Sequence, residues 1–163
     1  MLKDYDLFGE LLDDDVFAPN QKGNTKDIRA GDNAEYLTLF ALGEMGYDPC
    51  QGPRNGPVDI YVDIPDVGVV RIQVKGRNNR LKLNTMSFGF KRGYHASQTG
   101  SYDYDEKDFD VAACVLLPAR RVIFSYGVPK GSLNYRTKEF EMPDIERITF
   151  DQCLEKLSTV SRA

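Results

Sequence analysis

The sequence contains no tryptophan, one histidine (His95) and three cysteines, Cys50, Cys114 and Cys153. The cysteines show no paired spacing and a single histidine cannot complete a Cys/His ligand set, which disfavours disulfide and zinc-finger scaffolds. No run approaches the roughly 20 consecutive apolar residues of a membrane helix. The acidic first residues also lack the basic and apolar regions of a signal peptide. We therefore expect a cytoplasmic, intracellular protein with no membrane partner.

Acidic residues are missing from one long stretch, between Val67 and Tyr102. An even spread of the 25 acidic residues over the chain would place five or six of them there. The stretch instead holds seven basic residues, with no acid to oppose them: Arg71, Lys75, Arg77, Arg80, Lys82, Lys91 and Arg92. The formal net charge of −4 is thus the sum of acidic regions and one basic region. The basic stretch indicates an anionic partner.

The chain has 163 residues, of which 41% are hydrophobic, a length and composition that fit one packed domain. Residues 1–24 hold six acidic residues and two lysines and end in a polar segment, so we expect an acidic N-terminal arm and linker. Residues 25–163 are expected to form the single domain.

The spacing of apolar residues predicts a helix from Thr25 to Met45, ended by Gly46. Alternating apolar and polar residues predict two strands, 58–64 and 69–75, which the turn 65–68 joins as a hairpin. In this hairpin Asp59 falls on the same face as Gln73 and Lys75, because side chains alternate along a strand.

Three further strands are expected at 85–90, 111–117 and 121–126, the second of them a continuous apolar run suited to the centre of a sheet. A C-terminal helix is expected to start near Asp151, with Cys153 facing inward. The order of helices and strands predicts an α/β fold.

The predicted hairpin brings together groups that suit phosphodiester hydrolysis, which needs a divalent cation, a positioned water and a counter-charge for the transition state. Asp59 supplies a carboxylate, Gln73 an amide oxygen and Val74 a backbone carbonyl as metal ligands. Lys75 can orient or deprotonate water, or neutralise the developing charge on phosphorus. Glu35, in the preceding helix, can hold a metal-bound water from the opposite side.

Four segments in this order resemble the PD-(D/E)XK nuclease superfamily: Gly31–Leu37, Gly46–Tyr47, Pro57–Ile60 and Ile72–Lys75. Within it the sequence resembles archaeal Holliday-junction resolvases and, more closely, small group I intron homing endonucleases, over about residues 28–126. The Gln-x-Lys form and the acidic turn before the strand at 111–117 are similar to the second group. The resemblance implies a restriction-endonuclease-like core, with a central mixed β-sheet flanked by helices, and a source on a phage or mobile element.

By this resemblance Glu35, Asp59, Gln73 and Lys75 are the catalytic residues, and one or two Mg²⁺ ions per active site are the cofactor. The third of these positions is most often Asp or Glu in the superfamily, so Gln73 removes one charge from the metal site. Asp59 is then the one certain anionic ligand, which predicts weak metal binding unless Glu35 or the DNA phosphate contributes.

The expected function is that of a metal-dependent DNA endonuclease, site-specific in the manner of homing or restriction enzymes. Its partner would be double-stranded or branched DNA, and cutting both strands would require a homodimer or homotetramer. The expected DNA-binding residues follow the candidate active strand: Arg77, Arg80, Lys82, Lys91, Arg92 and His95. The alternatives are a junction resolvase, a catalytically silent DNA-binding module and an interaction protein whose basic face meets an acidic partner.

Several other residues compete for these roles. Asp63 lies roughly 13 Å along the strand from Asp59, too far to share its metal, and Asp66 belongs to the turn. The acidic residues between Asp103 and Asp110 could form a second metal cluster, although a turn that caps a strand is the simpler interpretation. His95 is a weaker candidate for a general base than for a DNA contact or loop residue.

Overall fold

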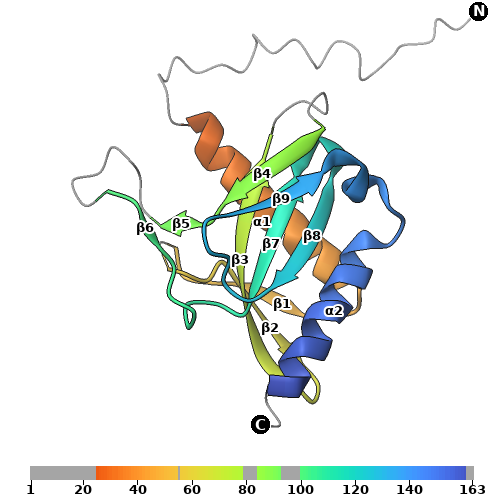
Figure 1. Cartoon of the computed structure of the whole chain (residues 1–163). Coiled ribbons are helices and arrows are strands. Elements are labelled where there is room, and N and C mark those ends of the chain that lie inside the picture. The colour runs from red at the N-terminus through yellow and green to blue at the C-terminus, as the bar shows by residue number, and fades with distance from the viewer. Residues whose placement is uncertain (1–24, 55, 79–83, 93–99, 161–163) are drawn as a thin grey trace, which may run out of the picture.

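The computed structural model describes residues 25–54, 56–78, 84–92 and 100–160 (Figure 1). The elements in chain order are α1 (Thr25–Glu44), β1 (Pro49–Gln51), β2 (Ile60–Ile64), β3 (Gly68–Arg77), β4 (Thr85–Gly89), β5 (Lys91–Arg92), β6 (Tyr102–Asp103), β7 (Val111–Leu116), η2 (Leu117–Ala119), β8 (Arg121–Tyr126), β9 (Ser132–Arg136), η3 (Thr137–Glu141) and α2 (Ile145–Val160). Neither α-helix of this described part is both long and apolar enough to cross a membrane.

A five-stranded mixed sheet in the order β1-β2-β3-β7-β8 forms the centre of the molecule (Figure 1). β3 and β7 run parallel, whereas the other neighbouring pairs are antiparallel. β7 is buried along its whole length, as expected for an apolar strand covered on both faces. The α/β prediction with a central mixed sheet is therefore confirmed.

The two faces of the sheet are covered by different structures. α1 and α2 pack on one face, where Ala34 and Leu42 of α1 and Phe150 of α2 join the buried strand residues. The opposite face is covered by the β4–β9 pair and η3, through Met86, Phe88 and Phe140 among others. Because each face excludes water through its own apolar cluster, the sheet is a stable platform for residues at its edges.

α1 lies unusually close to β3 at Gly76. A Cβ atom on Gly76 would lie 2.7 Å from the Cβ of Ala34 and 3.2 Å from the backbone oxygen of Ala30. Only glycine fits this approach without a shift of the helix. The contact brings Glu35, the residue after Ala34, near the strand that carries Gln73 and Lys75.

Most predicted elements are confirmed, with two kinds of difference. The predicted helix at 25–45, the hairpin and the strands at 85–90, 111–117 and 121–126 correspond to α1, β2–β3, β4, β7 and β8. The prediction that the C-terminal helix starts near Asp151 is wrong, because α2 begins at Ile145. The preceding residue, Asp144, has a positive φ of 55°, which is outside the helical range. The short strands β1, β5, β6 and β9 were not predicted, and the predicted arm 1–24 lies outside the described residues.

Candidate active site

Asp59 lies immediately before β2, with its backbone fixed from two sides. Its N–H donates to the carbonyl of Ile72 at 2.9 Å, and its own carbonyl accepts from the N–H of Gly52 at 2.7 Å. A Cβ on Gly52 would lie 2.3 Å from the backbone oxygen of Val58, so this approach also requires glycine. Asp59 is thus held at one place beside β3.

The Asp59 carboxylate accepts two hydrogen bonds from β3. Its Oδ2 receives the backbone N–H of Val74 at 2.7 Å and Nε2 of Gln73 at 2.5 Å. Burial raises the pKa of Asp59, while the Val74 N–H, the charge of Lys75 and the Gln73 amide lower it. The carboxylate is therefore partly desolvated, and a bound cation would favour its ionised form.

Gln73 is 4% exposed and has one polar atom without a partner. Its Nε2 faces Asp59, which leaves Oε1 buried with no hydrogen bond among the described residues. A buried acceptor without a donor is costly unless another group satisfies it. Carboxylate, amide and carbonyl oxygens are the donors that hard divalent cations prefer, so the chemistry of Asp59, Gln73 and the Val74 carbonyl fits Mg²⁺.

Lys75 follows two residues later on β3 and is partly buried. Its Nζ donates to the hydroxyl of Tyr104 at 3.4 Å and lies 5.6 Å from the centroid of that ring. Burial lowers the pKa of Lys75, whereas the charge of Asp59 raises it. A cationic group thus lies close enough to Asp59 for the two charges to interact.

Glu35 on α1 completes this group of residues. Burial raises the pKa of Glu35, and the repulsive charge of Asp59 raises it further. Its Oε2 accepts a hydrogen bond from Nε2 of Gln51 at 3.3 Å, and Arg54 acts on it through charge. Two carboxylates that repel each other are a setting in which a cation between or beside them is stabilising.

The four residues singled out from the sequence therefore come together in space from α1, the start of β2 and β3. No family model and no curated protein matches the chain. Among solved structures it is similar to a bacterial homing endonuclease, I-Ssp6803I, with a TM-score of 0.60 and 18% sequence identity. The alignment covers 82% of this chain and 95% of that chain. The fold is similar to that of a homing endonuclease.

The predicted DNA-binding residues divide into two groups. Arg80, Lys82 and His95 lie outside the described residues. Arg77 is exposed at the end of β3, where its Nε donates to the Ser87 carbonyl at 2.7 Å, and β5 carries Lys91 and Arg92. That these three described cations contact DNA stays a prediction.

The expectation that the seven cations are unopposed is wrong for two of them. Arg71 forms an ion pair with Asp110, with 2.8 Å between Nη2 and Oδ1, and Lys91 lies 4.0 Å from Asp103. Both acids come from beyond the acid-free stretch and reach it because β6 pairs with β5 and β7 with β3. An absence of acids along the sequence is therefore not an absence of acids in space.

The acidic turn before β7 is a structural turn. The Asp108 carboxylate accepts from the N–H of Asp105 at 2.8 Å, and the Asp105 carboxylate accepts from the N–H of Lys107 at 3.1 Å. No group of three or more His, Cys, Asp or Glu side chains able to hold a metal occurs in the described part of the chain. The interpretation as a strand cap agrees with these contacts.

Three residues near the site were not assigned roles from the sequence: Gln51, Arg54 and Tyr104. Gln51 lies on β1, an edge strand that was not predicted because prolines and glycines surround it in the sequence, and Arg54 follows it in the loop. Tyr104 belongs to the acidic turn, 29 positions after Lys75. The sequence did show that Tyr104 is an aromatic residue within an acidic turn. Its contact with Lys75, however, depends on the tertiary fold and has no local signal.

Proposed function

We propose that this chain is a metal-dependent DNA endonuclease of the PD-(D/E)XK type that hydrolyses phosphodiester bonds at specific sites. The observation that carries the proposal is the group formed by Glu35, Asp59, Gln73 and Lys75 at the β2–β3 pair. This group occurs within a fold similar to that of a bacterial homing endonuclease. Fold alone does not assign function, so the proposal rests on the chemistry of these side chains.

Asp59, the Gln73 amide and the Val74 carbonyl would hold Mg²⁺, and Glu35, which interacts with Asp59 through charge, would bind a water of its hydration shell. Ligation by Gln73 requires Oε1 to face the ion, the reverse of the orientation in which Nε2 donates to Asp59. The bound ion would polarise the phosphate and lower the pKa of a coordinated water. With few anionic ligands we expect weak binding of the metal until the DNA phosphate joins it.

The proposed reaction is attack of water on phosphorus with cleavage of the bond to the 3′ oxygen. The attacking water loses a proton, the 3′ oxygen gains one, and the products carry 5′-phosphate and 3′-hydroxyl ends. Lys75 provides a positive charge at the point where negative charge grows on the phosphate oxygens. Its partly buried setting strengthens that interaction relative to a lysine in water.

The surroundings of the site favour an extended anionic substrate over a small molecule. Two cavities of the described surface, of about 560 and 270 Å³, are lined by other residues than Glu35, Asp59, Gln73 and Lys75. Arg77, exposed at the end of β3 two residues after Lys75, instead offers a positive charge to a phosphate next to the one that is cleaved. Because the described part of each chain offers one such group, we propose that a homodimer or homotetramer cuts both strands.

The test is selection of cleaved sites from a randomised duplex library with Mg²⁺, followed by assay of variants on the selected site. Wild type should cleave it, chelation of the metal with EDTA should stop cleavage, and Asp59→Ala and Lys75→Ala should each slow it by about 10²-fold or more. Asp63→Ala on β2 and Lys138→Ala in η3 are matched controls, because both residues are exposed. Full cleavage by Asp59→Ala would refute the assigned site.

A four-way junction and a nicked duplex, assayed beside the linear duplex, separate the alternatives within this fold. Preference for the junction over every linear duplex would replace site-specific cutting with junction resolution. DNA binding without cleavage under any metal would indicate a silent binding module. Failure to bind DNA even at low salt would favour an acidic protein partner.

A further inference from the structure

Tyr104 is the residue that Lys75 contacts through its charged end. Among the described residues the Lys75 ammonium hydrogen-bonds to Tyr104 alone, and it also lies over the ring, 5.6 Å from the centroid. We propose that Tyr104 is a positioning residue that holds the Lys75 ammonium in the place from which it acts on the phosphate. This inference rests on the proposed function, in which Lys75 is the catalytic cation.

A lysine side chain needs such a partner to act from one fixed place. Its four-carbon stem rotates freely, so an unrestrained ammonium spends little time in any one position. A carboxylate in hydrogen-bonding contact with the ammonium would also hold it, but the phosphate would then have to compete with that ion pair. The Tyr104 hydroxyl and ring attract the ammonium through a lone pair and a quadrupole, and leave its charge intact.

Tyr104 is itself held against the apolar face of the sheet. Its ring meets Phe109 edge to face, with centroids 5.2 Å apart and planes at 76°, and Phe109 in turn packs on Phe90 with centroids 6.1 Å apart. Phe109 and Phe90 are buried. Burial raises the pKa of Tyr104 to about 12, so its hydroxyl stays protonated and neutral at physiological pH.

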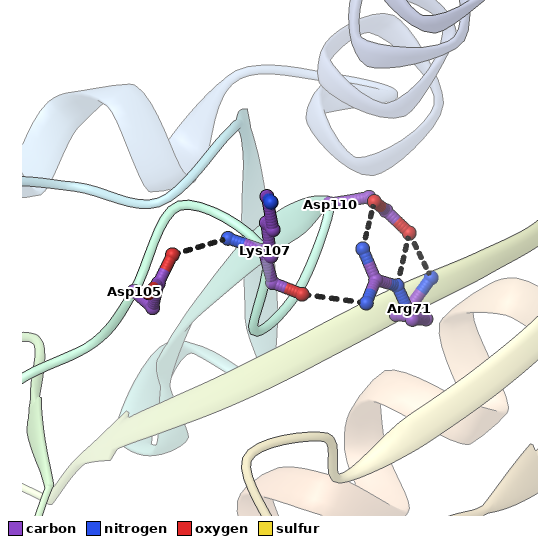
Figure 2. A network of polar contacts seen from close by, with 4 residues as sticks. All are labelled: Arg71, Asp105, Lys107 and Asp110. Carbon is purple, nitrogen blue, oxygen red and sulfur yellow. Dashed lines mark hydrogen bonds and ion pairs between the residues drawn. The ribbon is translucent and has the colours of Figure 1, made fainter.

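The turn that carries Tyr104 is anchored to the strand that carries Lys75 (Figure 2). Asp110 accepts hydrogen bonds from the backbone N–H, Nε and Nη2 of Arg71 at 2.9, 3.0 and 2.8 Å. Nη1 of Arg71 donates to the Lys107 carbonyl at 2.6 Å. Arg71 lies four residues before Lys75 on β3, so one strand fixes both the lysine and the turn that orients it.

Two substitutions separate positioning from packing. Tyr104→Phe keeps the ring, its packing on Phe109 and the attraction for the ammonium, but removes the hydroxyl. Tyr104→Leu removes the ring as well. Tyr102→Phe is the matched control, because Tyr102 is an exposed tyrosine in the same segment.

The first measurement is cleavage kinetics on the selected site, with kcat and KM determined separately. We expect kcat to fall by about 3–10-fold in Tyr104→Phe and by about 10²-fold in Tyr104→Leu, with little change in KM, since misplacement of a catalytic group mainly costs rate. Tyr102→Phe should retain the kcat of wild type. Wild-type kcat in both Tyr104 variants would overturn the proposal.

The second measurement needs no cleavage and therefore separates this inference from the proposed function. In protein labelled at lysine with carbon-13, the Cε–Hε signal of Lys75, assigned by its loss in Lys75→Arg, should be shifted by the ring. The shift should persist in Tyr104→Phe and disappear in Tyr104→Leu. A signal that stays in place in Tyr104→Leu would refute positioning. If Tyr104→Leu does not fold, Tyr104→Met takes its place in both assays.

Discussion

A methyl group added at Gly76 tests how closely α1 must approach β3 for the candidate site to form. In Gly76→Ala the new Cβ would lie 2.7 Å from the Cβ of the fully buried Ala34. Carbon atoms in contact prefer about 3.5–4.0 Å, so α1 or β3 must move by about 1 Å. Glu35 follows Ala34 and would move with the helix.

The expected loss of stability follows from two opposing effects. Overpacking of a core typically costs about 1–3 kcal/mol. Replacing glycine by alanine within a strand recovers roughly 0.5–1 kcal/mol, because alanine loses less conformational entropy on folding. The difference of these two effects predicts that Gly76→Ala lowers the free energy of unfolding by up to about 2.5 kcal/mol. The rate of cleavage should also fall, by up to about 10²-fold, because a shift of about 1 Å misplaces Glu35.

Urea denaturation of a double-mutant cycle with Ala34→Gly tests this explanation. Ala34→Gly alone should cost about 1 kcal/mol or more, from helix propensity and lost burial. The double variant lacks the Ala34 methyl group that the new methyl group at position 76 would meet. Its loss of free energy of unfolding should therefore be smaller than the sum of the two single losses by about 1 kcal/mol. Losses that add within about 0.5 kcal/mol, or a Gly76→Ala variant with the stability and cleavage of wild type, would refute the reasoning.

Two further predictions concern charges around the site. Asp110→Ala removes three hydrogen bonds from partly exposed Arg71 and should lower the free energy of unfolding by about 1–2 kcal/mol, measured by urea denaturation at low and high salt; an unchanged midpoint would contradict it. Burial and the charge of Asp59 raise the pKa of Glu35, so the folded state favours the protonated form of this side chain. Protonated Glu35 therefore contributes to the stability of the fold at low pH, and this contribution is lost as the pH rises above about 4.5, the ordinary pKa of a glutamate. Glu35→Gln should therefore gain stability relative to wild type between pH 4 and 7, by roughly 1 kcal/mol or less, with exposed Glu44→Gln as control. A difference that stays flat across this range would show that the raised pKa is absent.

The central elements could be predicted from sequence because their patterns are local. The alternation in β2 and β3 and the turn between them determine which side chains share a face, and the register pairs Ile60 with Ile72 and Tyr61 with Arg71. That register brings Asp59 next to Gln73 and Val74. The part of the site formed by the hairpin is therefore contained in a short segment.

The remaining elements depend on contacts between distant segments. β1 has three residues, one of them Pro49, and it exists as a strand because β2 offers it an edge. β9 alternates between exposed and half-buried residues and pairs with β4, far from it in sequence. Gln51 and Tyr104 could not be placed beside Glu35 and Lys75 for the same reason, since neither β1 nor the turn before β7 carries a local signal for its partner.

The order of charges along the sequence predicts only part of their arrangement in the fold. The acid-free stretch predicts seven basic residues with no acid to oppose them, yet the fold pairs Arg71 with Asp110 and brings Lys91 to within 4.0 Å of Asp103. Lys75 and Arg77 instead contact uncharged oxygens, the Tyr104 hydroxyl and the Ser87 carbonyl. A cation beside a neutral acceptor keeps its attraction for a phosphate, whereas a cation in an ion pair must first give up its partner. Among the described cations of the stretch, Lys75 and Arg77 at the end of β3 are thus more readily available to an anionic polymer than Arg71 and Lys91, each of which lies beside an acid.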